Sequence, residues 1–194
     1  MRWIILTGLL IVFCGCSGVT AFNKLNEISQ SAGEVVLPDD VQHWGMVQNS
    51  VFETKYNQML KNRTTNLEVA SKTVHGLEIA PGGVFSFNEV VGLATEEKGY
   101  KKAKIFLKGE EIMGLGGGIC QLSSALYNSA DQAGLEIVER HAHSMKVHYV
   151  PEGRDAATAY GGVDLKFKNT LKTPIRIHAQ MNDGTLKTWI ETIM

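Results

Sequence analysis

The stretch "GLGGGICQLSSALYNSA", residues 114–130, places a cysteine two positions after a run of three glycines. From Cys120 onward the sequence predicts a helix that ends at Gly134. The apolar residues that recur along one face of this helix are Leu122, Ala125, Leu126 and Ala130. Because glycine has no side chain, the loop would leave the first backbone N–H groups of the helix unshielded beside the cysteine sulfur.

The segments around this helix predict an α+β fold. A shorter helix, closer to the N-terminus, is expected over residues 64–77, with Thr64 or Thr65 as its cap. Pro81, Gly82 and Gly83 indicate a turn. After this turn, Phe85 and Phe87 alternate with Ser86 as on a half-buried strand.

Alternating side chains predict an antiparallel sheet in the rest of the chain. A strand, a turn at Lys108–Gly109 and a second strand are expected over residues 98–113. The strands expected after the central helix cover residues 135–150, 163–169, 173–180 and 184–191. Asp183 and Gly184 form a favourable hairpin turn between the last two of these strands.

The first residues indicate export. Arg2 precedes an apolar run from Trp3 to Phe13, which is too short to span a bilayer comfortably, so a secretory signal is expected. The ending "FCGCSG" also resembles a bacterial lipobox, in which Cys16 would become the lipidated first residue. An uncleaved anchor and ordinary cleavage remain alternatives. We therefore expect an exported protein that a lipid anchors to the outer face of the cytoplasmic membrane. We expect the chain to have three parts: a signal or lipoprotein peptide over 1–16, a tether over 17–45 and a domain over 46–194.

Composition and cysteine usage narrow the function. The net charge of −1 gives no reason to expect binding to nucleic acid, and 44% apolar residues allow a sizeable core. Two of the three cysteines, Cys14 and Cys16, belong to the signal region. An exported domain that retains only Cys120 cannot form an internal disulfide. This residue is then an intermolecular link, a metal ligand, a reactive thiol or an inert core residue.

A nucleophilic role needs a thiolate, a base and donors for an oxyanion. A helix N-terminus favours the thiolate of Cys120, and the N–H groups near Gly117 and Gly118 could hold an oxyanion. On an unbroken strand His141 and His143 would share one face, and both are candidate bases. The candidates for orienting the base, or for a place in the substrate site, are Asp155 and Asp164.

Other polar residues near the predicted site could bind substrate. Arg140 and Arg154 could hold a carboxylate in a bidentate way. At the start of the helix the candidates are Gln121, Ser123 and Ser124, although the serines could equally bond to the backbone. A zinc-dependent hydrolase is an alternative in which Cys120, His141 and His143 supply three ligands. No second cysteine or acid pair completes such a cluster, so neither a metal nor a cofactor is expected.

Five segments resemble, in this order, the VanW family of bacterial surface proteins: "PGGVFSFNEVVG", "KGY", "GGGICQLSSALYNSA", "ERHAHSMKVHYVPEGRDA" and "VDLKFKN". The resemblance covers roughly residues 63–179. It implies an L,D-transpeptidase that cross-links peptidoglycan through a cysteine, on a fold unrelated to the YkuD-type transpeptidases. The family's cysteine falls on Cys120, the histidine of its "HS" pair on His143 and the aspartate of "GRDA" on Asp155.

The implied chemistry is acyl transfer between stem peptides of peptidoglycan, or carboxypeptidase activity where water is the acceptor. The expected partners are stem peptides and, through the lipid anchor, a membrane surface. The main alternative is an envelope lipoprotein that binds peptidoglycan or glycopeptide without catalysis, because membership of a family does not by itself establish activity.

Overall fold

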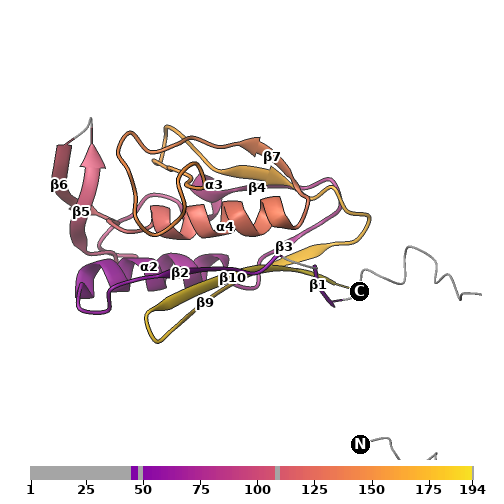
Figure 1. Ribbon diagram of the computed structural model, residues 1–194, viewed down its shortest axis with the longest axis horizontal. Helices are drawn as coiled ribbons and strands as arrows, with labels where there is room; N and C mark the ends of the chain where they lie inside the picture. The colour runs from indigo at the N-terminus through magenta and orange to yellow at the C-terminus, as the bar shows by residue number, and fades with distance from the viewer. Residues whose placement is uncertain (1–44, 48–49, 108–109, 194) are drawn as a thin grey trace, which may run out of the picture. The chain divides into compact units, whose positions relative to one another are not determined.

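The helix that begins at Cys120 lies at the centre of the fold, between two antiparallel sheets (Figure 1). This helix, α4 (Cys120–Gln132), is buried at every position from Gln121 to Ala130. A computed structural model describes residues 45–47, 50–107 and 110–193 of the chain. Antiparallel sheets with a few helices confirm the predicted α+β class.

The larger sheet covers one side of α4. Its strands follow the order β1–β10–β9–β3, and β2 also pairs with β10. The strands are β1 (Gly45–Met46), β2 (Phe52–Lys55), β3 (Glu78–Ile79), β9 (Ile175–Asn182) and β10 (Thr185–Thr192). Asp183 (φ 44°) and Gly184 (φ 73°) connect β9 and β10, so the predicted hairpin turn is confirmed.

The smaller sheet covers the other side of α4 in the order β4–β8–β7. Its strands are β4 (Val84–Ser86), β8 (Lys166–Lys168) and β7 (Glu136–Glu139). The strand expected through Phe85 and Phe87 ends at Ser86. The Ser86 hydroxyl accepts a hydrogen bond from the Glu89 N–H and caps the short helix α3 (Phe87–Val91).

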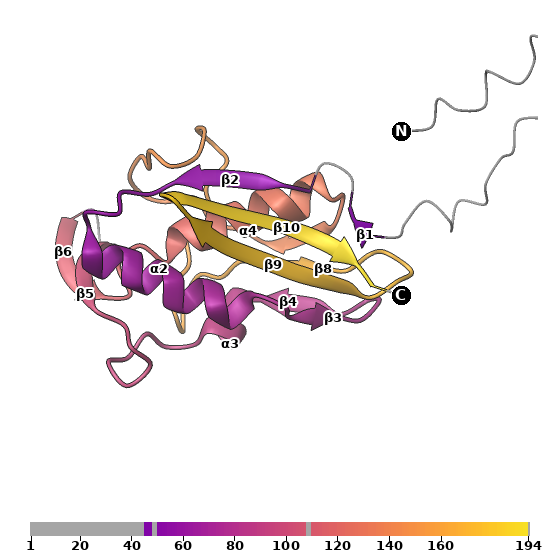
Figure 2. The ribbon, with the colours of Figure 1, turned by 90° about the horizontal axis from the view of Figure 1, so that it is seen from below.

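The helix α2 (Lys61–Val74) runs beside β9 along the larger sheet (Figure 2). It begins at Lys61, earlier than predicted, so the expected caps Thr64 and Thr65 lie inside it. The Thr64 N–H donates to the Leu60 carbonyl, and no side chain caps this helix. The first five residues of the helix, 61–65, are all polar. The apolar pattern therefore could not show where the helix begins.

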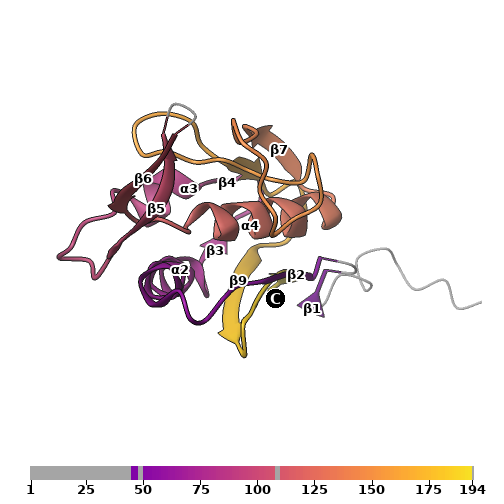
Figure 3. The same cartoon turned by 60° about the vertical axis from the view of Figure 1, so that its left-hand side comes forward.

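A hairpin of β5 (Lys102–Leu107) and β6 (Glu110–Leu115) lies beside the start of α4 (Figure 3). The predicted pair of strands in this region is confirmed. The turn expected at positions 108–109, like the signal peptide with Cys16 and the tether up to position 44, lies outside the described residues.

The strand predicted over residues 135–150 is wrong beyond Glu139. The sheet ends there, and only a single bridge between His141 and Ala157 continues the pairing. Most side chains from 141 to 148 are exposed. This segment therefore has no apolar face to bury, and apparent alternation alone did not make a strand. Among the described helices, none is long and apolar enough to cross a membrane.

Candidate functional site

A close backbone approach and a buried side-chain amide fix the start of α4. Gly117 packs so tightly on the hairpin that an added Cβ would lie 2.5 Å from the Lys104 carbonyl oxygen. The buried amide of Asn66 on α2 donates to the carbonyls of Lys101 and Gly117 at 2.9 Å, and accepts from the Lys101 N–H at 2.7 Å. Close packing thus requires glycine in this run. The packing places Cys120 next to the β5–β6 hairpin and the start of α2.

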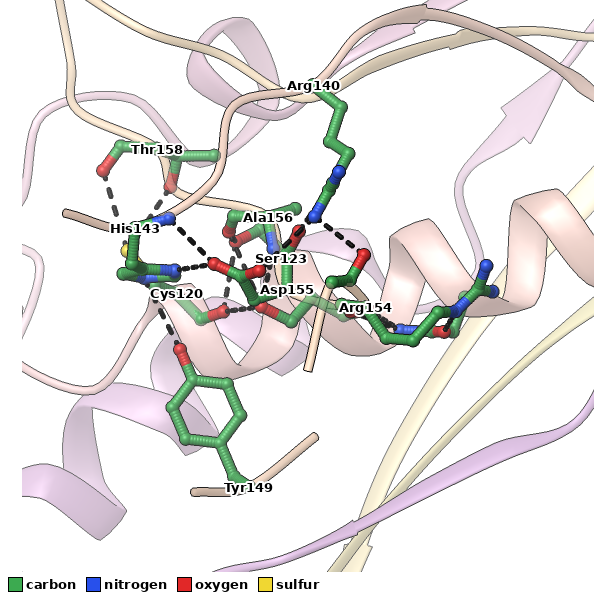
Figure 4. A network of polar contacts seen from close by, with 12 residues as sticks. Cys120, Ser123, Arg140, His143, Tyr149, Arg154, Asp155, Ala156 and Thr158 are labelled. Atoms are coloured by element: carbon green, nitrogen blue, oxygen red, sulfur yellow. Dashed lines mark hydrogen bonds and ion pairs between the residues drawn. The ribbon is translucent and has the colours of Figure 1, made fainter. Parts of the chain in front are cut away.

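Cys120, His143 and Asp155 form a chain of contacts at this point (Figure 4). The Nδ1 atom of His143 lies 2.6 Å from Asp155 Oδ2, and the backbone N–H of His143 donates to the same oxygen at 2.7 Å. Because the carboxylate accepts from Nδ1–H, Nε2 is the ring nitrogen left to exchange a proton with the sulfur. The His143 and Asp155 side chains are 10% and 11% exposed, so water screens their interaction little.

The environment shifts the pKa values of all three groups toward their charged forms. Burial raises the pKa of the Cys120 thiol, but hydrogen bonds with His143 and Thr158 and the nearby imidazolium charge outweigh it, so this pKa lies below its ordinary 9.0. Burial lowers the pKa of His143, yet its bonds to Cys120 and Asp155 raise it above 6.5. Burial raises the pKa of Asp155, and contacts with His143 bring it below 3.8. This electrostatic balance favours a thiolate beside an imidazolium.

Arg140 holds the aspartate in place. Its Nε donates to the Asp155 carbonyl at 2.6 Å, and its Nη2 lies 3.2 Å from Asp155 Oδ1 and 2.8 Å from the Gly153 carbonyl. The guanidinium also lies 4.9 Å from the centre of the Tyr127 ring. Arg140 was a candidate for binding a substrate carboxylate. In the structure it orients the carboxylate of this chain instead.

The serines of α4 fasten the next loop to the helix. Ser123 Oγ donates to the Ala156 carbonyl at 2.6 Å, and Ser124 Oγ donates to the Cys120 carbonyl at 2.7 Å and accepts from the Ala156 N–H at 2.9 Å. Both serines are fully buried. They position Asp155 through its neighbour Ala156, and neither serine lines the cavity beside Cys120.

Tyr149 and Thr158 also lie at the site, although neither was predicted from the sequence. The Tyr149 hydroxyl lies 3.4 Å from His143 Nε2. Burial, followed by the charge of Cys120, raises the pKa of Tyr149, so the hydroxyl stays protonated and can donate. Thr158 lies on the other side of the sulfur, with its carbonyl 3.5 Å and its hydroxyl 3.7 Å from Sγ. Tyr149 lies within the segment "ERHAHSMKVHYVPEGRDA", but nothing in that segment singled it out, and Thr158 lies just beyond it.

The sulfur opens onto a cavity of about 900 Å³. The cavity lies among the starts of α2 and α4, helix α3, the hairpin β5–β6 and the loops after β7. Its lining includes Arg63, Gly118, Cys120, Gln121, His143, Tyr149 and Thr158. Gly118 adopts φ +107°, and an added Cβ would meet the Arg63 side chain at 2.6 Å. Cys120 is therefore half-buried and reachable, not sealed in the core.

The remaining candidates lie elsewhere. Arg154 lies outside this cavity and binds Asn128 and Asp131 at 2.6 and 2.8 Å. Asp164 is buried and also lies outside it. Its carboxylate accepts from the Ser86 hydroxyl at 2.6 Å and from the N–H groups of Asn88 and Leu165. Asp164 thus ties the start of α3 to β8.

The structure does not assemble the predicted zinc ligands. The His141 ring is exposed and bonds Glu139 at 3.1 Å, whereas His143 bonds Asp155. Within the described ranges, no group of three or more His, Cys, Asp or Glu side chains is placed to hold a metal ion. The zinc alternative therefore lacks a ligand set in this part of the chain.

Comparison with known proteins adds the family. The model of the VanW family, described as VanW like protein, matches residues 62–190. The chain belongs to this family. The match lies within the expected domain over residues 46–194 and contains all seven of the cavity residues named above.

Two curated relatives belong to the comparison. "Uncharacterized protein YoaR" of Bacillus subtilis (strain 168) is 44% identical over 144 residues, which are 74% of this chain and 48% of that protein. "Vancomycin B-type resistance protein VanW" of Enterococcus faecalis (strain ATCC 700802 / V583) is 32% identical over 140 residues, 70% of this chain and 50% of that protein. The chain thus spans about half the length of the curated relatives it matches. No solved structure matches it significantly.

Proposed function

We propose that the protein is a cysteine-dependent acyl transferase of the cell envelope that acts on peptidoglycan stem peptides, as an L,D-transpeptidase or, with water as acceptor, a carboxypeptidase. The observation that supports this proposal best is the chain Cys120–His143–Asp155 at the edge of a cavity. A nucleophile, a base within reach of it and a carboxylate that orients the base are the parts that covalent acyl transfer needs.

In the first half-reaction, the Cys120 thiolate attacks the carbonyl carbon of the third stem residue. The carbonyl electron pair moves to oxygen and gives a tetrahedral oxyanion. The Tyr149 hydroxyl and the N–H groups at the start of α4 donate hydrogen bonds to this oxyanion. When the intermediate collapses, the C–N bond breaks and the amine of the terminal D-alanine leaves with the proton of His143. A thioester on Cys120 remains.

In the second half-reaction, an amine of a neighbouring stem attacks the thioester carbonyl. The now neutral His143 accepts the proton of this amine, and the C–S bond breaks to restore the thiolate and the imidazolium. A new amide links the two stems, whereas attack by water yields a free carboxylate. The charge pair that exists before the reaction is thus regenerated after it.

The export signal, the lipid anchor at Cys16 and placement at the outer face of the cytoplasmic membrane belong to the same proposal. They rest on the sequence of the first eighteen residues, which the structure does not describe. A relative whose printed name includes vancomycin resistance agrees with a role at the cell wall.

The deciding experiment is muropeptide analysis of isolated cell wall after incubation with the purified full-length protein, with Cys120→Ala as the matched control. We expect new cross-links, or stems shortened by one residue, with the wild type only. Equal product profiles for the two proteins would refute the mechanism. If Cys120→Ala still bound peptidoglycan while neither protein changed it, the non-catalytic binding function would replace it.

A further inference from the structure

Arg63 is an arginine of the cavity lining that no carboxylate of this chain neutralises among the described residues. The Arg63 guanidinium is half-buried at the start of α2. It donates to Gln121 Oε1 at 3.3 Å and lies 5.9 Å from the centre of the Tyr149 ring. No carboxylate among the described residues forms an ion pair with it. Arg140 and Arg154, the two arginines that the sequence suggested for substrate binding, are each paired with an aspartate of this chain.

Gln121 fixes the direction of this guanidinium. Its buried amide NH2 donates to Thr54 Oγ1 and to the Lys55 carbonyl, both at 2.9 Å, so its oxygen is the atom left to face Arg63. Gln121 follows Cys120 directly in α4. A guanidinium has five N–H donors, and one bond to an amide leaves most of them for a ligand.

The charged residues of the cavity lining agree with this preference for an anion, although Lys104 and Lys146 pair with Glu111 and Glu152 outside the lining. The lining contains Lys55, Arg63, Lys104 and Lys146, and no aspartate or glutamate among the described residues that line it. Position 118 is also a glycine, and any side chain there would collide with Arg63. Gly118 therefore leaves room for the Arg63 side chain, and no carboxylate among the described residues lines the cavity.

We propose that Arg63 is the specificity-determining residue that binds a carboxylate of the acyl donor next to the scissile bond. In the proposed reaction, which this inference extends, that group is the terminal carboxylate of the departing amino acid. A planar guanidinium matches a carboxylate with two parallel hydrogen bonds, which a lysine cannot reproduce. Donors whose terminal carboxylate is free are then selected over donors whose terminus is an amide.

The test compares two alkylating agents that differ in one charge. The Cys120 thiolate attacks the CH2 carbon of iodoacetate or iodoacetamide, the C–I bond breaks, and iodide leaves from a thioether. Rates are measured by mass spectrometry on the peptide that contains Cys120 in the full-length protein. The observable is the iodoacetate-to-iodoacetamide rate ratio, divided by the same ratio for glutathione. We expect a value well above one in the wild type and a fall of about tenfold in Arg63→Gln, the size expected for one charge-assisted hydrogen bond.

Two further variants separate recognition from folding. Arg176→Gln removes the same charge from β9, outside the cavity, where Arg176 pairs with Glu78. It should leave the ratio unchanged, and Arg63→Lys should restore part of it. A purely structural role for Arg63 would slow both reagents equally in Arg63→Gln. That result, or a wild-type ratio equal to that of glutathione, would overturn the inference.

Substrate turnover distinguishes this inference from the proposed function. Wild-type protein is given stem tetrapeptides that end in a free carboxylate or in an amide. We expect a higher KM for the amide, and an Arg63→Gln variant that no longer discriminates between the two. Turnover of both peptides with equal KM would overturn the role of Arg63 and leave acyl transfer intact. Identical products with Cys120→Ala would instead refute acyl transfer through Cys120.

Discussion

At the residue scale, two opposing effects act on the sulfur of Cys120. Burial disfavours the thiolate, but the hydrogen bonds with His143 and Thr158 and the charge of the imidazolium together outweigh it. Removing the histidine leaves burial opposed only by the contacts with Thr158. We therefore expect His143→Ala to raise the pKa of Cys120. Alkylation by iodoacetamide at pH 7 should slow by about tenfold or more, because each pKa unit changes the thiolate fraction tenfold. Rates measured across a pH series give both pKa values, and an unchanged midpoint would contradict this interpretation.

The aspartate is predicted to act on the tautomer of the base. In Asp155→Asn the amide NH2 can face Nδ1, which places the remaining ring proton on Nε2 and prevents this nitrogen from accepting a proton from the thiol. We expect acyl transfer to fall about 100-fold or more, within the range for loss of general base catalysis.

Asp164→Asn is the matched control for this variant. It also replaces a buried aspartate, but one that bonds Ser86 and the start of α3. We expect Asp164→Asn to lower the free energy of unfolding by about 1–3 kcal/mol and to leave the reactivity of Cys120 unchanged. Equal losses of acyl transfer in the two variants would show that Asp155 has no special role.

The sequence allowed the cysteine, histidine and aspartate to be proposed because each stands in a dense local motif. Arg63 lies outside these motifs, and Tyr149 shares the motif of His143 and Asp155 but meets His143 only in the folded chain. Arg63 is 58 positions from its partner Gln121, and only the packing of α2 beside α4 brings the two together. A single arginine at the start of a helix carries no sign of such a contact. Arg140 and Arg154 drew attention as candidates because they flank the motif, and the structure gives both of them internal partners.

At the element scale, the glycine run determines how closely the hairpin approaches α4. Three glycines precede Ile119. Among them, only Gly117 would place an added Cβ within 3 Å of backbone atoms of the hairpin, which belong to Lys104 and Ala103. We expect Gly117→Ala to push β5 away from α4, to lower the free energy of unfolding by about 1–3 kcal/mol and to slow alkylation of Cys120. Thermal unfolding and iodoacetamide rates measure these two effects.

Gly162→Ala controls for the loss of a glycine without a clash. Its added Cβ would meet Ala159 at 3.5 Å, an ordinary contact, and Gly162 does not adopt a positive φ. This variant should resemble the wild type in stability and in alkylation rate. If Gly117→Ala were as stable as Gly162→Ala, the close approach would not be a constraint on the fold.

The elements that could be predicted are those with a clear apolar pattern. The strands β5, β6, β9 and β10 and the helix α4 alternate or repeat cleanly, and all were expected. The strand expected to continue past Glu139 was wrong because residues 141–148 are mostly exposed. That error matters for the site, since the irregular backbone after β7 is what turns His143 and Tyr149 toward Cys120. A continuous strand would have kept His141 and His143 on one face, as the zinc interpretation required.

At the scale of the whole molecule, α4 joins its two neighbouring layers through polar contacts as well as apolar packing. Ser129 bonds Thr188 at 2.6 Å in the larger sheet, and Gln121 bonds Thr54 there. On the opposite side, Ser123 and Ser124 bond the backbone of Ala156. Buried hydroxyls and amides with satisfied partners fix one arrangement of the layers. The site draws on both sides of the helix, so its geometry depends on the complete fold.

The charge pair in the site should also appear in the stability of the whole molecule. The pKa of Asp155 is lowered below 3.8 on folding, so its contribution is present above pH 3.8 and is lost as the pH falls through its folded pKa. The pKa of His143 is raised above 6.5, so its contribution is present below pH 6.5 and is lost as the pH rises through its folded pKa. Both contributions are complete only between pH 3.8 and pH 6.5.

We expect the difference in unfolding free energy between wild type and Asp155→Asn to be largest in that window and to shrink on either side. Urea unfolding at several pH values measures this difference, with Asp164→Asn as a comparison that lacks the histidine partner. A difference that stays constant from pH 3 to pH 9 would mean that the aspartate and the imidazole are not coupled.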